Sequence, residues 1–184
     1  MTKKECRQKY LKTRNEIPAS KKADFDKKLT DKILFLPEFE SAECILLFAS
    51  VGSEVDTWEI FNECIRQNKK VYFPKCIDGE RMVFFRAVSK NDFTNGKYNI
   101  PEPTSDEKYT LHSKNDLAVI PALAVGKDFS RLGYGKGYYD RFLKDFKGIS
   151  VCPVYPQLLT ESVPTDEFDI PPKIIITPTD LIRR

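Results

Sequence analysis

The feature that most constrains the fold is an unbroken apolar run at residues 117–125, followed by a polar turn, a glycine-rich loop and a helical pattern. A continuous run bounded by turn residues is typical of a strand buried on both faces, as in a largely parallel sheet. Shorter apolar runs elsewhere alternate with amphipathic segments. We therefore expect an α/β fold, a three-layer α/β/α sandwich with a central, mostly parallel (mixed) sheet, Rossmann-like, in a single domain over residues 1–184.

The glycine-rich loop at residues 131–137 reads Arg-Leu-Gly-Tyr-Gly-Lys-Gly. Its glycines stand at alternate positions, where the absence of a Cβ lets backbone N–H groups point into one concavity. The following helix adds unpaired N–H groups and the positive end of its dipole, and Arg131 and Lys136 add two cations. The loop suits a polyphosphate. Its spacing matches neither a Walker A loop nor the dinucleotide fingerprint, so on the residues alone a tight structural turn is the alternative.

A helix is predicted at the N-terminus, where Thr2 and Glu5 have the spacing of a capping box. Lys3 lies in its first turn, and Arg7 follows four residues later on the same face. Cations at this end of a helix are unfavourable by up to about 1 kcal/mol. Two readings are open: a solvated, lysine-rich terminus, or a segment that binds an anion.

Two carboxylates are candidate ligands because of their positions. Glu54 follows a predicted strand at residues 44–49 and a glycine turn, so it is either a hydrogen-bond acceptor for a substrate or a solvated loop residue. Asp140 stands beside the glycine-rich loop, and magnesium is usually bound by one or two carboxylates together with substrate phosphates. The alternatives for Asp140 are an acid that stabilises the helix start and a partner of Arg141.

The carboxyl ends of parallel strands gather the ligands of an α/β sheet. We therefore expect Glu54, Lys75, the turn at residues 101–103 and the loop at residues 131–140 to share one cleft.

Prolines and polar stretches mark the remaining elements. The run at residues 71–73 is predicted to stop at Pro74 and to pair with the next apolar run as an edge hairpin, and the last strand is expected at residues 173–177. The polar segment at residues 89–115 is too long for an idle connection and is predicted to frame a site. We assign no role to His112 within it.

The composition excludes several classes of protein. The chain has 184 residues, 41% hydrophobic and 31% charged, and its formal net charge of +3 gives no footprint of a nucleic-acid binder. No apolar segment approaches the length of a membrane span, and no signal-peptide core is present. The cysteines are scattered and odd in number, which indicates reduced thiols rather than disulfides or a zinc site. We expect a cytoplasmic monomer that binds a small molecule, with no nucleic-acid or membrane partner.

Four segments together carry a family resemblance. They are Lys-x-x-x-Arg at residues 3–7, Ser-Glu-Val-Asp-Thr at 53–57, Ile-Pro-Glu-Pro at 100–103, and the loop at 131–140. In these segments, and over nearly the whole chain, the sequence resembles the 5-formyltetrahydrofolate cyclo-ligase family (methenyltetrahydrofolate synthetases). The resemblance implies an ATP- and Mg²⁺-dependent enzyme of folate and one-carbon metabolism. The sequence departs from the family at Lys173, where a second aspartate is often found. A phosphate contact is the alternative role for Lys173.

The resemblance also implies roles for individual residues. Arg131 and Lys136 would be catalytic, and Asp140 would bind the metal. ATP would be bound by Lys3, Arg7, Arg131, Leu132, Gly133, Tyr134, Gly135, Lys136, Gly137, Tyr138 and Tyr139. The folate substrate would be bound by Ala49, Glu54, Tyr134, Gly135, Lys136, Gly137 and Tyr138.

The implied reaction converts 5-formyltetrahydrofolate to 5,10-methenyltetrahydrofolate with release of ADP and phosphate. The formyl group on N5 is amide-like, and conjugation of this kind gives a rotation barrier of roughly 18–20 kcal/mol. Transfer of the ATP γ-phosphoryl group to the formyl oxygen removes that conjugation and makes the oxygen a leaving group, after which N10 attacks the same carbon within one molecule. The protein has to supply positioning and charge neutralisation.

Two other readings compete with this one. A sugar-phosphate isomerase or a CoA-transferase relative would share the architecture and would turn over without ATP. A nucleotide- or RNA-binding module would do no chemistry, and the small net charge argues against it.

Overall fold

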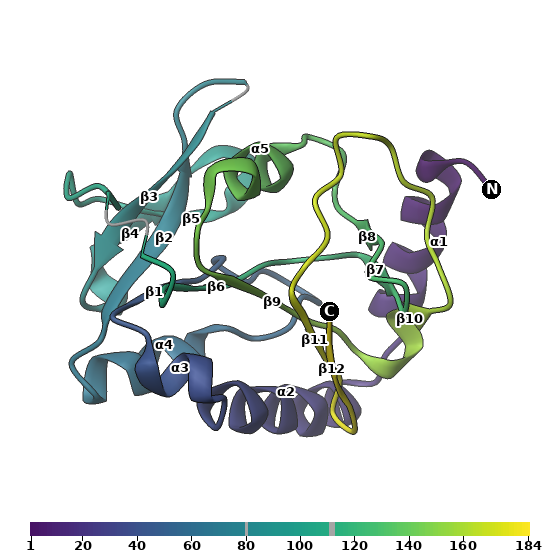
Figure 1. Cartoon of the computed structure of the whole chain (residues 1–184), viewed down its shortest axis with the longest axis horizontal. Coiled ribbons are helices and arrows are strands. Elements are labelled where there is room, and N and C mark those ends of the chain that lie inside the picture. The colour runs from purple at the N-terminus through teal and green to yellow at the C-terminus, as the bar shows by residue number, and fades with distance from the viewer. Residues whose placement is uncertain (80, 111–112) are drawn as a thin grey trace.

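The computed structural model describes residues 1–79, 81–110 and 113–184, so His112 lies outside the described residues. The central sheet has seven strands in the order β12-β11-β9-β6-β1-β2-β3 (Figure 1). They are β1 (Cys44–Leu46), β2 (Lys70–Cys76), β3 (Met82–Ala87), β6 (Leu117–Val119), β9 (Ile149–Pro153), β11 (Ile174–Ile176) and β12 (Leu181–Arg183). The inner strands run parallel, and β3 and β12 are antiparallel edges. The predicted mostly parallel sheet is confirmed.

Helices cover both faces of this sheet, which confirms the three-layer α/β/α arrangement. In Figure 1, α2, α3 and α4 lie below the sheet and α5 lies above it. The helices are α1 (Lys3–Asn15), α2 (Ala19–Leu34), α3 (Pro37–Ser41), α4 (Trp58–Arg66) and α5 (Tyr138–Asp145). No helix of the described residues has the length and apolar character needed to cross a membrane.

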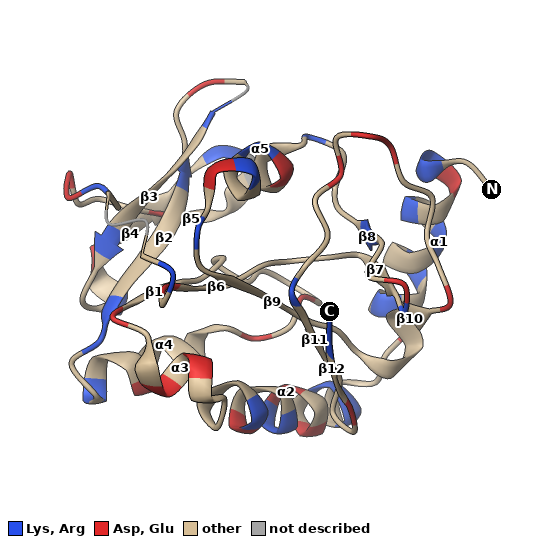
Figure 2. Ribbon diagram, viewed as in Figure 1, with Lys and Arg blue, Asp and Glu red and all other residues tan. Residues whose placement is uncertain are grey.

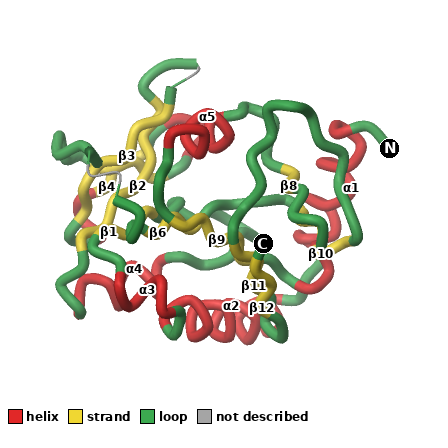
Figure 3. Tube along the Cα trace, viewed as in Figure 1, coloured by secondary structure: helices red, strands yellow, loops and turns green. Residues whose placement is uncertain are grey.

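Two small sheets and short 3₁₀ turns complete the fold. In Figure 3, the region between α5 and α1 consists largely of loops. One small sheet contains β7 (Ala124–Gly126), β8 (Arg131–Leu132) and β10 (Leu159–Thr160); the other contains β4 (Phe93–Asn95) and β5 (Pro101–Pro103). The 3₁₀ turns are Lys90–Asp92, Lys97–Asn99 and Pro156–Leu158. The long polar segment predicted at residues 89–115 is therefore partly ordered as a hairpin.

The N-terminal helix begins as its sequence predicts. Thr2 accepts a hydrogen bond from the Glu5 backbone N–H, and the Glu5 carboxylate accepts one from the Thr2 N–H, so the capping box is formed. α1 lies beside the sheet of β7, β8 and β10 (Figure 1). Its buried Cys6 packs against Leu132 of that sheet, and this contact holds α1 next to the glycine-rich loop.

The prediction that residues 117–125 form one strand is wrong. β6 ends at Val119 and pairs within the central sheet, whereas β7 begins at Ala124 and pairs with β8 and β10. Pro121 lies between them and cannot donate to a strand ladder, so the chain changes direction there. The run is apolar throughout because both strands are buried, so its hydrophobicity does not reveal the bend.

Pro74 does not stop a strand, because β2 continues through it to Cys76. β1 pairs with β2 only as far as Tyr72, whose carbonyl accepts from the Leu47 N–H. Residues two apart in a strand direct their N–H groups to the same side, so Pro74 lacks an N–H on the side where β1 has already ended. The missing donor therefore costs no ladder bond.

The strand expected at residues 173–177 is found as β11, but it is not the last. A turn held by Thr177 and Asp180 follows, with the Asp180 N–H donating to the Thr177 hydroxyl over 2.8 Å. The chain then returns antiparallel as β12. β12 is short and partly exposed, so its apolar pattern was too weak to predict a strand.

Candidate active site

A cavity of about 980 Å³ lies at the carboxyl ends of β1 and β6. These strands are neighbours, and the chain continues from β1 toward β2 on one side and from β6 toward β9 on the other. Their junction is the switch point where ligands bind in doubly wound sheets. Phe48 and Ala49 follow β1, Pro121 follows β6, and all three line the cavity. The fold therefore brings the predicted loop to the expected end of the sheet.

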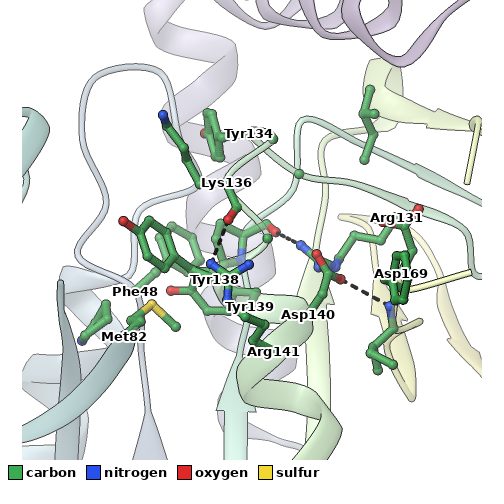
Figure 4. A pocket seen from close by; sticks show the side chains of 18 of the residues that line it. Phe48, Met82, Arg131, Tyr134, Lys136, Tyr138, Tyr139, Asp140, Arg141 and Asp169 are labelled. Atoms are coloured by element: carbon green, nitrogen blue, oxygen red, sulfur yellow. Dashed lines mark hydrogen bonds and ion pairs between the residues drawn. The ribbon is translucent and has the colours of Figure 1, made fainter. Parts of the chain in front are cut away.

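The cavity has two chemically different ends (Figure 4). Phe48 and Met82 lie at one end and form an apolar wall. Arg131, Asp140 and Asp169 lie at the other end, among several more charged side chains. Such a cavity suits a ligand, or a pair of ligands, with a flat apolar part and an anionic part.

Each glycine of the loop faces an arginine. A Cβ on Gly133, Gly135 or Gly137 would come within 3.2, 2.9 or 2.7 Å of a guanidinium atom, belonging to Arg131, Arg7 and Arg141 in that order. The alternate glycines therefore make room for guanidinium groups, which the sequence pattern did not reveal. Gly135 and Gly137 also have φ values of +93° and +66°, a region that glycine adopts without strain.

Arg131 lies beneath the loop as part of a buried ion pair. Its Nη2 donates to Asp140 Oδ1 over 2.5 Å and its Nη1 donates to the Pro121 carbonyl over 3.3 Å, while the side chain is almost fully buried. Asp140 Oδ1 also accepts from the Ile170 N–H over 3.1 Å. Asp140 is therefore paired with Arg131 rather than with Arg141, the partner considered from the sequence. Leu132 is buried in the cluster under the small sheet and also lines the cavity.

The cations of α1 reach the same end of the cavity. Arg7 Nε donates to the Gly133 carbonyl over 2.9 Å, and Lys3 Nζ lies 2.6 Å from Asp166 and also bonds Asp169. Burial lowers the pKa of the Lys3 ammonium, but hydrogen bonds to the two carboxylates raise it more, so the net shift is upward. Figure 2 shows the acidic loop before β11 close to the basic face of α1. Protein carboxylates thus supply the anion that this helix end requires.

Lys136 and the two tyrosines after the loop also line the cavity. Arg141 Nη2 donates to the Lys136 carbonyl over 2.8 Å, and its guanidinium lies 5.4 Å from the centre of the Tyr138 ring. The Tyr138 hydroxyl donates to the Asp78 carbonyl over 3.2 Å. Tyr139 packs edge-on against Phe84 with ring centres 6.5 Å apart. Both tyrosines are therefore held in place at the middle of the cavity wall (Figure 4).

Ala49 and Glu54 also line the cavity. Glu54 Oε2 accepts from the Val51 N–H over 3.0 Å, and Oε1 accepts from the Tyr134 hydroxyl. Burial and the nearby Glu54 charge raise the pKa of Tyr134, although Arg14 opposes the shift, so Tyr134 remains the proton donor. The structure thus joins the glycine-rich loop directly to Glu54.

The prediction that Lys75 shares this cleft is wrong. Its ammonium lies 5.7 Å from the centre of the Phe85 ring, and Pro74 and Cys76 line the cavity instead. Side chains alternate between the two faces of a strand, so Lys75 points to the face opposite the one on which Pro74 and Cys76 line the cavity. Glu102 of the predicted turn does line the cavity, and it accepts from the Cys76 N–H over 3.1 Å.

Several lining residues were not singled out from the sequence. Phe48 could have been found, because it stands beside Ala49 at the carboxyl end of a predicted strand. Asp166 and Asp169 lie in the polar loop before β11, where a run of acids gives no sign that it reaches a cavity. Met82 and Lys97 come from the neighbouring hairpins, whose approach to the site no local pattern indicates. Lys173 is exposed and outside the cavity lining among the described residues.

The site fits a magnesium ion that arrives with a nucleotide. Among the described residues there is no cluster of three or more His, Cys, Asp or Glu side chains that could hold a metal ion by itself. Asp140 receives both of its described hydrogen bonds on Oδ1, so its second oxygen is available as a ligand. One or two carboxylates completed by phosphates and water is the usual arrangement for Mg²⁺.

Fold and cavity define an α/β enzyme with a glycine-rich loop at the switch point of its sheet. A model of the 5-formyltetrahydrofolate cyclo-ligase family matches residues 1–178. The chain is 28% identical over 173 residues to the 5-formyltetrahydrofolate cyclo-ligase of Haemophilus influenzae, covering 91% of this chain and 92% of that protein. It is 25% identical over 172 residues to the Escherichia coli 5-formyltetrahydrofolate cyclo-ligase, covering 90% and 94%.

A solved structure agrees with these matches. The NMR structure of Aquifex aeolicus 5,10-methenyltetrahydrofolate synthetase superposes with a TM-score of 0.88 at 30% identity, covering all of this chain and 93% of that one. The chain belongs to the 5-formyltetrahydrofolate cyclo-ligase family. The resemblance noted from the four sequence segments is confirmed, and the names of the relatives support an enzyme that converts 5-formyltetrahydrofolate to 5,10-methenyltetrahydrofolate.

Proposed function

We propose that this chain catalyses the ATP- and Mg²⁺-dependent conversion of 5-formyltetrahydrofolate to 5,10-methenyltetrahydrofolate, with release of ADP and phosphate. The observation that carries the proposal is the two-ended cavity, with an apolar wall at one end, Arg131, Asp140 and Asp169 at the other, and Glu54 and the glycine-rich loop in its lining. We further propose that residues 1–184 act as one domain, as a cytoplasmic monomer without nucleic-acid or membrane partners.

The ionic end is proposed to bind ATP. Arg7 contacts the loop at the Gly133 carbonyl, Lys136 belongs to the loop, and α5 begins directly after it. Lys3, now paired with carboxylates, would exchange them for phosphate oxygens. Asp140 would hold Mg²⁺, with Arg131 keeping the carboxylate oriented. When bound, Mg²⁺ neutralises phosphate charge and aligns the γ-phosphoryl group.

The apolar end is proposed to bind the folate. The flat pterin ring would lie between Phe48, Met82 and Tyr138, and Glu54 would accept hydrogen bonds from its ring nitrogens. Ala49 lines the wall where a larger side chain would fill the space. This placement directs the N5 formyl group toward the loop.

The reaction follows from bringing these two ends together. The formyl oxygen attacks the γ-phosphorus of ATP, the bond to the β-phosphate oxygen breaks, and ADP leaves. Arg131 and Lys136 are proposed to stabilise the charge that develops on the transferring group. N10 then attacks the formyl carbon, the phosphate leaves with the original formyl oxygen, and N10 loses its proton. No protein nucleophile is required, so the enzyme contributes proximity, which can be worth about 7–11 kcal/mol.

The test is turnover itself. Wild-type protein with 5-formyltetrahydrofolate, ATP and magnesium should produce the near-ultraviolet absorbance of the methenyl product, and omission of ATP should abolish it. Lys136→Ala should lower kcat by about tenfold or more, because a charge-stabilising group is lost. Lys127→Ala is the matched control, since Lys127 pairs with Glu161 on the small sheet, away from the cavity lining. Turnover without ATP would refute the proposal.

A further inference from the structure

The structure assigns a positioning role to Arg14: through Tyr134 it holds the carboxylate of Glu54 at the folate end of the cavity. This inference rests on the proposed function, because the orientation of Glu54 matters only if folate binds there. Arg14 comes from α1 and is 6% exposed. It does not line the large cavity but lies against a second cavity of about 10 Å³ behind Glu54, so it does not contact ligand directly.

The hydrogen bonds run in one direction along this group of residues. Arg14 Nη1 donates to the Tyr134 oxygen over 2.7 Å, and Arg14 Nε donates to Ser53 Oγ over 3.1 Å. A guanidinium has no acceptor, so the tyrosine oxygen accepts from Arg14 and the tyrosine hydroxyl donates to Glu54 Oε1. The Ser53 hydroxyl in turn donates to Asn15 Oδ1 over 2.5 Å. The turn that carries Glu54 is thereby fastened to α1 twice.

The charge of Arg14 also argues for a role beyond packing. Among the described residues no carboxylate forms a direct ion pair with Arg14. A buried charge is tolerated only when it is compensated, and here the compensating charge is Glu54, one hydroxyl away. Merely fastening α1 to the core would be done as well by an apolar side chain. The arrangement polarises the Tyr134 hydroxyl and orients it toward the Glu54 carboxylate.

Folate can bind without breaking this arrangement. Each carboxylate oxygen can accept two hydrogen bonds, so Glu54 can keep its bonds from Tyr134 and Val51 while it accepts others from a ring nitrogen. Loss of the Tyr134 hydroxyl, or of the Arg14 guanidinium that orients it, would leave Glu54 Oε1 without a fixed donor and the carboxylate held by the Val51 N–H alone. The effect should therefore fall on folate binding rather than on the chemical step.

The experiment compares Arg14→Gln, Tyr134→Phe and the double variant. Lys12→Ala is the control for the charge of α1, because the Lys12 side chain is 79% exposed and pairs with Glu16 on the same helix. Each single variant should raise the KM for 5-formyltetrahydrofolate, and its directly measured Kd, by about tenfold, equivalent to about 1.4 kcal/mol. For Arg14→Gln, whose side chain does not line the large cavity, the KM for ATP and kcat should stay within about twofold. The double variant should be no worse than either single one, because both remove the same interaction.

Two outcomes overturn the inference. One is a change in Tm with an unchanged folate Kd, which is what a merely structural Arg14 would give. The other is a double variant whose increase in folate Kd equals the product of the two single increases. Should Arg14→Gln fail to fold, Tyr134→Phe keeps the test, since it removes one hydroxyl from a ring that is 46% exposed. Failure of wild-type protein to bind or convert 5-formyltetrahydrofolate would instead refute the proposed function, so the two failures are distinguishable.

Discussion

Gly135 shows at the residue scale why the loop needs glycine. Its φ is +93°, and a Cβ there would lie 2.9 Å from the guanidinium carbon of Arg7. A non-glycine residue at positive φ costs of order 1–3 kcal/mol even without a clash. Gly135→Ala should displace Arg7, raise the KM for ATP by about tenfold and lower Tm. Gly79→Ala, where an added Cβ meets nothing within 4 Å, is the control. An unchanged KM for ATP would show that Arg7 does not contribute to ATP binding.

Asp140 combines two roles that mutation will expose together. Asp140→Asn removes the negative partner of buried Arg131, and loss of one partner of a buried pair is worth about 3–5 kcal/mol. We therefore expect a lower Tm as well as a raised magnesium requirement. Asp145→Asn, an exposed acid on the same helix, should change neither. A magnesium titration of activity checks this, and an unchanged midpoint in Asp140→Asn would remove it from the metal site.

Cys76 reports on occupancy of the cavity. It is partly exposed and lines the cavity, whereas the other cysteines are buried. Burial raises the pKa of Cys76 despite an opposing hydrogen bond with Tyr138, and burial raises the pKa of Cys152 to about 12. Since the thiolate is the reactive form, a disulfide reagent should label about one thiol per folded chain, faster as pH rises. Added 5-formyltetrahydrofolate should slow the labelling. Equal rates with and without it would place the folate elsewhere.

At the scale of elements, β12 is tied to α3 by Arg183 and Glu38. The hydrogen bond from Arg183 is the largest cause that lowers the pKa of Glu38 below 4.5. A lowered native pKa gives stability that is present above the unfolded-state value and is lost as pH falls through the native one. Arg183→Ala should therefore reduce the free energy of unfolding at pH 7, by about 1 kcal/mol or less because the pair is partly exposed. Below both pKa values the variant and wild type should converge in urea unfolding; a difference that persists there contradicts this account.

The same scale shows where sequence reasoning succeeds and where it stops. Local chemistry was readable: the capping box of Thr2 and Glu5 formed, and the loop after β8 leads into α5 as its glycines indicated. The chain bends at Pro121, and β2 continues through Pro74. Both outcomes depend on how far the neighbouring strands extend, and the residues of one strand do not encode this. Likewise, the prediction for Lys75 was wrong because the neighbouring strands determine which side chains of β2 face the cavity.

For the whole molecule, the site is assembled from segments that are distant in sequence. Arg7 and Gly133 meet although 126 residues separate them, and Tyr134 meets Glu54 across 80. The loop and its cations could be predicted from residue types, but their convergence with α1 came only from the family resemblance. Phe48 and Met82 of the apolar wall were missed because apolar side chains look alike in a core and in a binding cavity.

The central claim is that the two ends of one cavity bring an ATP γ-phosphoryl group onto a folate formyl oxygen. The most direct measurement follows the fate of that oxygen. With 5-formyltetrahydrofolate labelled with oxygen-18 in the formyl group, the account predicts that the label appears in the inorganic phosphate released during a single turnover. Label that is absent from phosphate while the methenyl product still forms would show that the formyl oxygen leaves by another route, and would contradict the account.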